Sequence, residues 1–226
     1  MDAVFICLAN SRKLSGRCVA GLRTDGGGWI RPVSHEESGT LWPRHYTLND
    51  GREARLLDVI EVVVTSPRPE PHQPENWVLG ERRWRLVRRL EPATAWKAGV
   101  LGEFLAPGPY LLGNRTDRLD YSTLLESPAR SSLALIEPAG VSWDIIGQFG
   151  GRRQTRARFQ LSGVTYNLSV TDPNWEQRLS ELSYGIHPRA AAGISQQDRL
   201  LFTVSLGEPF KGECYKLVAA VLVLPQ

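Results

Sequence analysis

The fold is decided by a stretch near the middle of the second half of the chain, Arg152-Arg153-Gln154-Thr155-Arg156-Ala157-Arg158-Phe159-Gln160-Leu161, which continues as Ser162-Gly163 and Val164-Thr165-Tyr166-Asn167-Leu168-Ser169-Val170-Thr171. Successive side chains of a β-strand point to opposite faces of the sheet. The even-numbered polar residues of the first segment therefore share one face, and the other face becomes apolar toward Leu161. Because glycine tolerates a positive φ, Ser162-Gly163 can form a tight turn. The pattern predicts a β-hairpin over residues 152–171, with Tyr166, Leu168 and Val170 facing inward.

The outward face of this predicted hairpin is basic. It carries Arg152, Arg156 and Arg158 on the first strand and Asn167 on the return strand. Guanidinium groups are always charged and fork onto phosphate oxygens, so this face is suited to a polyanion. The same pattern is also typical of the solvated outer face of an ordinary sheet, and the hairpin alone does not separate the two interpretations.

The composition indicates a globular protein. The chain has 226 residues, of which 42% are hydrophobic and 23% charged, enough for one large domain or two small ones. The formal net charge is only +3. The net charge therefore does not indicate nucleic acid as a partner. Only local clusters of arginine can indicate such a partner in this chain.

The three cysteines, Cys7, Cys18 and Cys214, are far apart and form no CxxC pair. This number and spacing fit neither a fully paired disulfide framework nor a zinc site. We also find no signal-peptide pattern and no apolar run long enough to span a membrane. The expectation is a cytoplasmic protein with no membrane contact, no metal and no cofactor.

Short apolar and β-branched runs recur in both halves of the chain and predict strands. They lie at residues 4–8, 17–22, 29–33 and 56–64, and again at 133–136, 141–146, 200–206 and 216–224. Helical character is limited to 93–105 and 175–182. An OB-type barrel has about five strands. We therefore predict an all-β protein with minor α content, built as a first OB-like barrel with an appended helix (1–106), a connector (107–131) and a second OB-like barrel (132–226).

Two further segments are candidates for binding nucleic acid. Residues 82–89 hold five arginines around Trp84, of which Arg83 and Arg85 would share a face if the segment is a strand. Strand and helix both remain open here, and Trp84 is a possible platform for base stacking. The second segment, predicted to be a loop over residues 10–17, offers three cations that could hold a phosphate or be merely solvated: Arg12, Lys13 and Arg17.

A proline-flanked loop, residues 72–77, could line a ligand pocket. Gln73, Glu75 and Asn76 offer hydrogen-bonding groups, and Trp77 could form a wall. The alternative is that Trp77 simply anchors the loop onto the barrel.

Several of these segments resemble the dual OB-containing domain family. The resemblance is carried by residues 7–11, 16–21, 28–34, 72–77, 205–210 and 214–220, which read CLANS, GRCVAG, GWIRPVS, HQPENW, SLGEPF and CYKLVAA. These segments run over nearly the whole chain. The resemblance implies two OB-like barrels in tandem and a nucleic-acid-binding role, in prokaryotic conflict or antiviral systems, together with a separate effector protein. It implies no catalytic residues.

The sequence thus predicts a non-catalytic module that binds nucleic acid, single-stranded RNA or DNA in preference to duplex. Two alternatives stay open. One is a protein-interaction module that docks an acidic partner or an effector. The other is a metal-dependent nuclease or base-processing enzyme, for which Asp58, Glu61 and the cluster at His35 are the candidate groups, although none forms a recognised catalytic motif.

Overall fold

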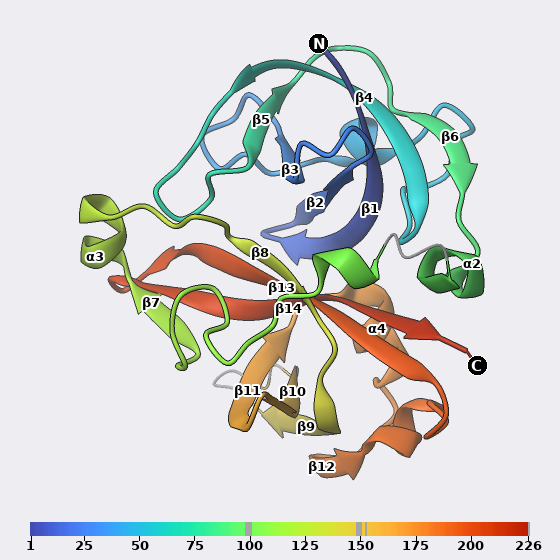
Figure 1. Cartoon of the computed structure of the whole chain (residues 1–226), viewed down its shortest axis with the longest axis vertical. Helices are drawn as coiled ribbons and strands as arrows, with labels where there is room; N and C mark the ends of the chain where they lie inside the picture. The colour runs from blue at the N-terminus through green and yellow to red at the C-terminus, as the bar shows by residue number, and fades with distance from the viewer. Residues whose placement is uncertain (98–100, 148–150, 152, 226) are drawn as a thin grey trace.

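The computed structural model describes residues 1–97, 101–147, 151 and 153–225. Over these residues the chain folds into two β-sheets of six and eight strands, with four short α-helices. Figure 1 shows the two sheets as an upper and a lower body that meet along the strands β13 and β14. The prediction of an all-β protein with minor helical content is therefore confirmed.

The first sheet is a closed five-stranded barrel. Its elements are β1 (Asp2–Lys13), β2 (Gly16–Arg23), β3 (Trp29–Val33), α1 (Pro43–Tyr46), β4 (Asp58–Pro67) and β5 (Asn76–Leu79), with β6 (Arg85–Arg89) added at the edge of β4. The strand order is β1-β2-β3-β5-β4, and β1 also pairs with β4 and closes the ring. The β3–β5 pair is parallel and the other pairs are antiparallel. This is an OB-type five-stranded barrel with a short helix before the fourth strand.

Strand β1 can close the barrel because it is long and irregular. Its first half, Asp2–Ile6, pairs with β4, and the strand pairs with β2 as far as Lys13. The β1–β2 register shifts between Cys7 and Ala9. Gly21 lies opposite this point, and a Cβ there would come within 2.0 Å of the Ile6 carbonyl oxygen. The strand bends where glycine lets the two backbones approach closely.

The second sheet repeats the same path. Its elements are β7 (Arg118–Asp120), α3 (Tyr121–Glu126), β8 (Leu133–Ile136), β9 (Ala139–Gly147), β10 (Arg153–Leu161), β11 (Val164–Val170), α4 (Pro173–Arg178), β12 (Gly185–Pro188), β13 (Arg199–Phe210) and β14 (Glu213–Leu224). The order β9-β10-β11-β14-β13 matches that of the first barrel, and β11–β14 is the parallel pair. Here the first strand is divided at Glu137-Pro138: β8 pairs with β13, and β9 pairs with β10.

The hairpin predicted from the sequence is β10–β11. Arg156 lies opposite Ser169 and Arg158 opposite Asn167. The turn residues Ser162 and Gly163 both have positive φ, 48° and 81°. Burial alternates as expected, with the odd-numbered side chains of β10 from Thr155 onward buried and the even-numbered ones partly or fully exposed. Tyr166, Leu168 and Val170 are buried in the barrel, as predicted.

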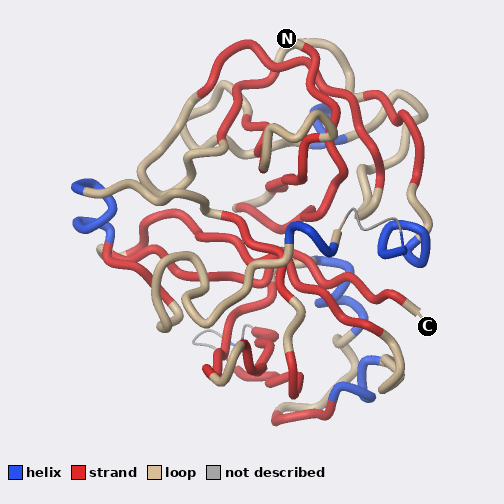
Figure 2. The backbone as a smooth tube through the Cα atoms, viewed as in Figure 1, coloured by secondary structure: helices blue, strands red, loops and turns tan. Residues whose placement is uncertain are grey.

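The two barrels share an apolar contact. Ile6 and Leu8 of β1 belong to the same buried cluster as Leu135, Leu201 and Leu224 of the second barrel. A second cluster joins Ala9 and Ala20 to Leu133, Ala219 and Ala220. Figure 2 shows that strands make up most of this junction. The barrels are thus fused by packing.

The segments between the barrels differ in part from the prediction. Instead of one helix over 93–105, the structure has α2 (Pro92–Lys97) and a 3-10 turn, η1 (Gly102–Phe104), with 98–100 outside the described residues. The predicted connector, 107–131, packs on the second barrel, where β7 pairs with β14. The short helix expected over 175–182 is α4, followed by β12 and η3 (Arg189–Ala192). The domain boundaries remain a prediction.

We expect Leu135→Ala to destabilise the whole chain, because Leu135 is 1% exposed in the cluster shared by both barrels. Truncation of a buried leucine costs about 2–5 kcal/mol. Denaturant unfolding followed by tryptophan fluorescence should show this loss with one cooperative transition. The matched control is Leu125→Ala, at a leucine that is 58% exposed, which should change stability by less than about 0.5 kcal/mol. Two separate transitions in the unmodified chain would contradict a fused pair of barrels.

Candidate nucleic-acid interface

The outer face of β10–β11 holds one arginine in a fixed position. Arg156 donates from Nε to Asn167 Oδ1 at 2.9 Å and from Nη1 to Ser169 Oγ at 3.0 Å, and Nη2 donates to the Asn167 carbonyl. Gln154 Oε1 lies 3.4 Å from Nη1. Asn167, predicted as a contact residue, therefore orients the guanidinium. In OB folds, the face of the second and third strands is the one that binds oligonucleotides and oligosaccharides, and β10 and β11 have these positions here.

All these acceptors are neutral oxygens, and Arg156 makes no ion pair with a described carboxylate. Burial lowers the pKa of its guanidinium from the ordinary value, while the charges of Asp117 and Asp144 oppose that shift. A half-buried cation with no direct ion pair has lost part of its hydration, and the more distant charges of Asp117 and Asp144 compensate this only in part. An anion on this face would supply that charge.

A hollow of about 540 Å³ lies beside Arg156. Its lining residues come from β10–β11, from the segment before β7 and from the β13–β14 hairpin, and include Gln154, Ser169, Asp117, Tyr215 and Lys216. Phe210, near the tip of the hairpin, also lines it and is 61% exposed. The Arg118 guanidinium lies 4.7 Å from the centre of the Tyr215 ring and pairs with Asp117 at 2.8 Å. The hollow thus combines a free cation with exposed aromatic surface.

Lys216 forms the floor of this hollow and was not identified from the sequence. Its side chain is 1% exposed, and Nζ donates to Asn114 Oδ1 at 2.6 Å, the Thr116 carbonyl at 2.7 Å and the Asn114 carbonyl at 3.1 Å. Burial lowers the pKa of its amine to about 8, although the charge of Asp117 opposes this. No local motif marks the residue, because its partners lie about a hundred positions away.

The other arginines of the hairpin have different surroundings. Arg158 is exposed and makes no ion pair with any residue that the structure places. Arg153 lies at the start of β10 and donates to the Leu179 carbonyl at 2.9 Å and to the Leu182 carbonyl. The predicted contact residue Arg152 lies outside the described residues. Arg156, Arg158 and Asn167 are therefore the predicted residues that the structure brings together.

The basic segment at 82–89 does not form a comparable face. It is a strand only from Arg85 to Arg89, and Arg85 and Arg89 pair with Glu61 and Asp58 of β4. These are the two carboxylates considered above for a nuclease, and each has an arginine partner. Arg83 is exposed and has no ion pair within the described chain.

The prediction of Trp84 as a stacking platform is wrong. Its side chain is 1% exposed and packs edge-on against Phe5, with ring centroids 6.1 Å apart, in the core of the first barrel. The arginines on both sides of Trp84 suggested an exposed ring. However, Trp84 is the one aromatic residue of the 82–89 segment, and its side chain points into the barrel core while the arginines beside it face solvent.

The predicted loop over 10–17 is mostly strand, because β1 continues to Lys13 and only Leu14 and Ser15 form the turn. Its cations are all paired. Arg12 lies 2.7 Å from Glu176, Lys13 2.6 Å from Glu208 and Arg17 2.9 Å from Glu53. The Arg12 and Lys13 pairs connect the first barrel to the second, so these residues have a structural role in the unbound protein.

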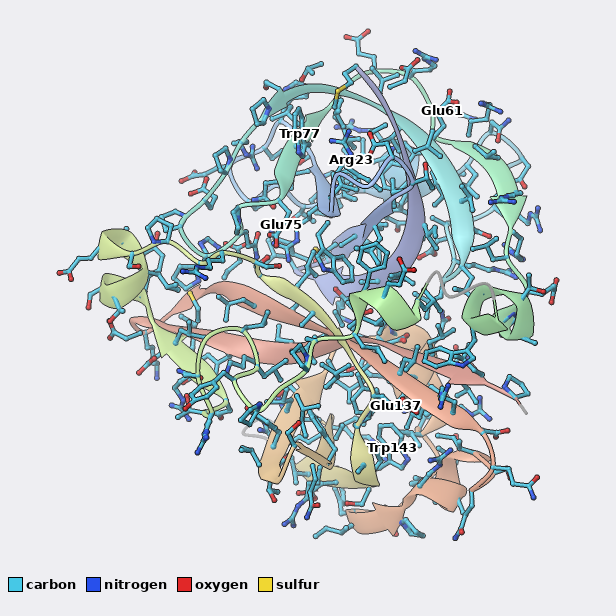
Figure 3. All side chains as sticks on the ribbon, in the orientation of Figure 1. Arg23, Glu61, Glu75, Trp77, Glu137 and Trp143 are labelled. Carbon is cyan, nitrogen blue, oxygen red and sulfur yellow. The ribbon has the colours of Figure 1, made fainter. Side chains whose placement is uncertain are left out.

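The loop at 72–77 lies at the junction of the barrels. Gln73 and Asn76 line a cavity there. Glu75 does not, since its carboxylate accepts bonds from Ser131 Oγ at 2.6 Å, Ser132 N at 2.7 Å and Ser132 Oγ at 2.7 Å. Trp77 is half-buried against the first barrel's core, as an anchoring residue would be. In Figure 3, Glu75 lies between the first barrel and the strand β8, and Trp77 on β5 above it.

The described residues contain no group of three or more His, Cys, Asp or Glu side chains that could hold a metal ion. None of the helices in that part of the chain has the length and apolar character needed to cross a bilayer.

The topology and the β10–β11 face define a protein with two OB barrels, a class of fold that commonly binds oligonucleotides and oligosaccharides. The chain belongs to the dual OB-containing domain family, whose model matches residues 4–221, so the resemblance seen in the sequence is confirmed. Comparison with curated proteins gave no match. Solved structures that match include the crystal structure of the tetrameric p202 HIN2, with 9% identity, a TM-score of 0.28, and coverage of 99% of this chain and 91% of that one. A similarity this distant carries no argument about function.

The lowered pKa of Lys216 predicts a pH-dependent stability. Between pH 8 and the ordinary lysine value of 10.5, the folded chain loses this proton while the unfolded chain keeps it. Because the unfolded state then binds more protons at this site, Lys216 contributes a positive slope of the unfolding free energy against pH, at most about 1.4 kcal/mol per pH unit. Burial raises the pKa of the Cys7 and Cys214 thiols, so these two groups contribute a slope of the opposite sign toward the upper end of the interval. Urea denaturation at several pH values measures the net slope. A Lys216→Met chain lacks only the contribution of Lys216, so its slope should be more negative than that of the unmodified chain by up to about 1.4 kcal/mol per pH unit. Equal slopes for both chains would refute the assignment.

Proposed function

We propose that this protein is a non-catalytic module that binds single-stranded nucleic acid on the outer face of β10–β11. The observation that carries the proposal is Arg156, which is fixed by Asn167 and Ser169 and has no described carboxylate partner. Phosphate oxygens would complete its hydrogen bonds and its charge. Arg158, exposed two residues along the same face of the strand, would contact the next part of the backbone.

The preference for a single strand is supported by the shape and chemistry of the hollow beside Arg156. Proteins that bind single strands combine a cationic groove with aromatic side chains on which bases stack. Phe210 and Tyr215 line the hollow together with Gln154 and Ser169, whose amide and hydroxyl groups can bond to sugars and base edges. A duplex would present its bases only through its grooves, and would leave these aromatic faces unused.

We extend the proposal to a recruiting role, in which the module holds the strand for a separate effector protein within a prokaryotic conflict system. This extension is supported by the family to which the chain belongs.

The test is the double variant Arg156→Gln, Arg158→Gln, assayed by fluorescence anisotropy against single- and double-stranded DNA and RNA. Oligonucleotides of about 16 nucleotides cover the site of one OB fold. Each charge-assisted contact is worth about 1.5 kcal/mol or more, so the variant should bind single strands about 100-fold more weakly. The slope of log affinity against log salt should become shallower by about 1.4, at about 0.7 for each lost phosphate contact.

A matched control removes the same charge elsewhere. Arg52 and Arg82 lie on the first barrel, are exposed, and are paired with Asp50 and Asp2. The double variant Arg52→Gln, Arg82→Gln should keep nearly full affinity. If both double variants lose affinity equally, binding depends only on overall charge and the proposed site is incorrect. Tighter binding of duplex than of single strands would contradict the strand preference.

A further inference from the structure

A hollow of about 570 Å³ with a polar wall lies at the junction between the barrels. We call it the junction cavity. The first barrel contributes the β1–β2 turn at Leu14, the segment after β3 at Glu37 and Ser38, and the β4–β5 loop from Arg68 to Asn76. The second barrel and the segment before it contribute Tyr121, Glu208 and Pro209. In an OB fold, the loops that join the first to the second strand and the fourth to the fifth flank the ligand, so this cavity occupies the ligand end of the first barrel.

Three polar side chains in the wall of the junction cavity are almost fully buried. His72, Gln73 and Asn76 are 3%, 4% and 3% exposed. Within the described residues, Asn76 Oδ1 and His72 Nδ1 have no hydrogen-bond partner, and Gln73 Oε1 accepts only a long bond of 3.5 Å from Asn76. Buried polar groups are normally satisfied, so a group of them with unused bonding capacity calls for an explanation. A bound molecule with several donors and acceptors gives one.

The charges of the junction cavity oppose a phosphate. Glu37, Glu70 and Glu208 supply three carboxylates. The cations are already engaged, since Lys13 pairs with Glu208 and Arg68 donates to the carbonyls of Ser34 and Glu36 at 3.1 and 3.0 Å. Burial would raise the pKa of Glu208, but the His72 hydrogen bond and the charge of Lys13 overcome this and lower it to about 2. The cavity therefore remains anionic near neutral pH and suits a neutral polar ligand.

The junction cavity is adjacent to the hollow beside Arg156. Glu208 lines both, with Pro209 lining the cavity and Gly207 and Phe210 lining the hollow. A single segment of the β13–β14 hairpin, residues 207–210, thus separates an anionic cavity from a cationic face. A strand whose backbone lies at Arg156 could pass this segment with a base turned into the cavity.

We propose that the junction cavity binds a nucleobase, with the amides of Gln73 and Asn76 contacting its hydrogen-bonding edge and Tyr121 contacting its ring. The nucleobase could come from two sources. One is a base of the bound strand, and for this source the inference rests on the proposed function. The other source of the same chemistry is a free nucleoside. Tyr121 is suited to this role because it is partly exposed at the rim and lies edge-on to His72, with ring centroids 5.8 Å apart.

The first experiment uses a series of single-stranded oligonucleotides, each with one base removed at a different position. The unmodified protein should bind one member of this series about tenfold more weakly, as expected for the loss of one stacked base. Tyr121→Ala should weaken binding of the intact strand by about the same factor and should abolish the difference between the members. The matched control is Tyr184→Ala, at a tyrosine on the second barrel that is 62% exposed, which should leave the series unchanged.

A second measurement does not depend on a variant. A strand with 5-iodouracil at the sensitive position should, on irradiation, crosslink to the peptide that contains Tyr121 or His72. Titration of the protein with free nucleosides, followed by NMR, should perturb the same residues if the cavity also takes the free ligand. Crosslinks only on β10 or β11, or a series in which every member binds alike, would overturn the base site.

The outcomes separate the two proposals. If Arg156→Gln, Arg158→Gln reduces affinity for every member of the series alike, while no position shows base sensitivity, the nucleic-acid face stands and the base site fails. If oligonucleotides do not bind but free nucleosides perturb Tyr121 and His72, the base site stands and the proposed function fails.

Discussion

The central part of the β13–β14 hairpin, residues 200–206 and 218–221, is buried on both of its faces, and the arrangement of the whole molecule depends on this. Leu200, Phe202 and Val204 of β13 face the core of the second barrel. The alternate residues face the first barrel: Leu201 joins the shared cluster, and Thr203 Oγ1 donates to the Leu8 carbonyl at 2.6 Å. Each buried apolar side chain here contributes roughly 1.5–3 kcal/mol by leaving water. The contact fixes the relative position of the two barrels, and with it the tip of the hairpin.

This burial accounts for a pattern in the sequence. Strands with two buried faces have continuous apolar runs, whereas strands with one solvated face alternate. The segments 4–9 and 200–206, which read VFICLA and LLFTVSL, are of the first kind, and 153–161 is of the second. The alternation of β10 and β11 was therefore sufficient to predict the hairpin and its two faces. The continuous apolar runs predicted strands. They did not predict that the second face packs against the other barrel, because a continuous run does not indicate what covers that face.

The candidate site could be predicted only in part, for a related reason. The sequence shows which residues are cationic, but ion pairs form between residues far apart in the chain. Lys13 and Glu208 are separated by 195 positions, and Arg85 and Glu61 by 24. Sequence reasoning therefore included Arg12, Lys13, Arg17 and Arg85 among the candidates together with Arg156. The buried position of Trp84 and the role of Lys216 likewise depend on long-range packing. The sequence could place Arg156 and Asn167 on one face because they lie on neighbouring strands of one hairpin.

Most of the candidate cations form ion pairs, so Arg156 and Arg158, which have no carboxylate partner among the described residues, matter most for binding an anion. The chain has 27 Lys and Arg against 24 Asp and Glu, so its overall field is weak at distances beyond the Debye length. Attraction of a polyanion must then come from local positive potential, on a face where the cations are not neutralised. Arg156 is held in place by the protein before any ligand arrives, so binding an anion there costs little side-chain ordering. If the proposed function holds, the carboxylates on the far side of residues 207–210 would limit how far a phosphate backbone can extend along the molecule, and this limit would give the bound strand a defined position relative to the junction cavity.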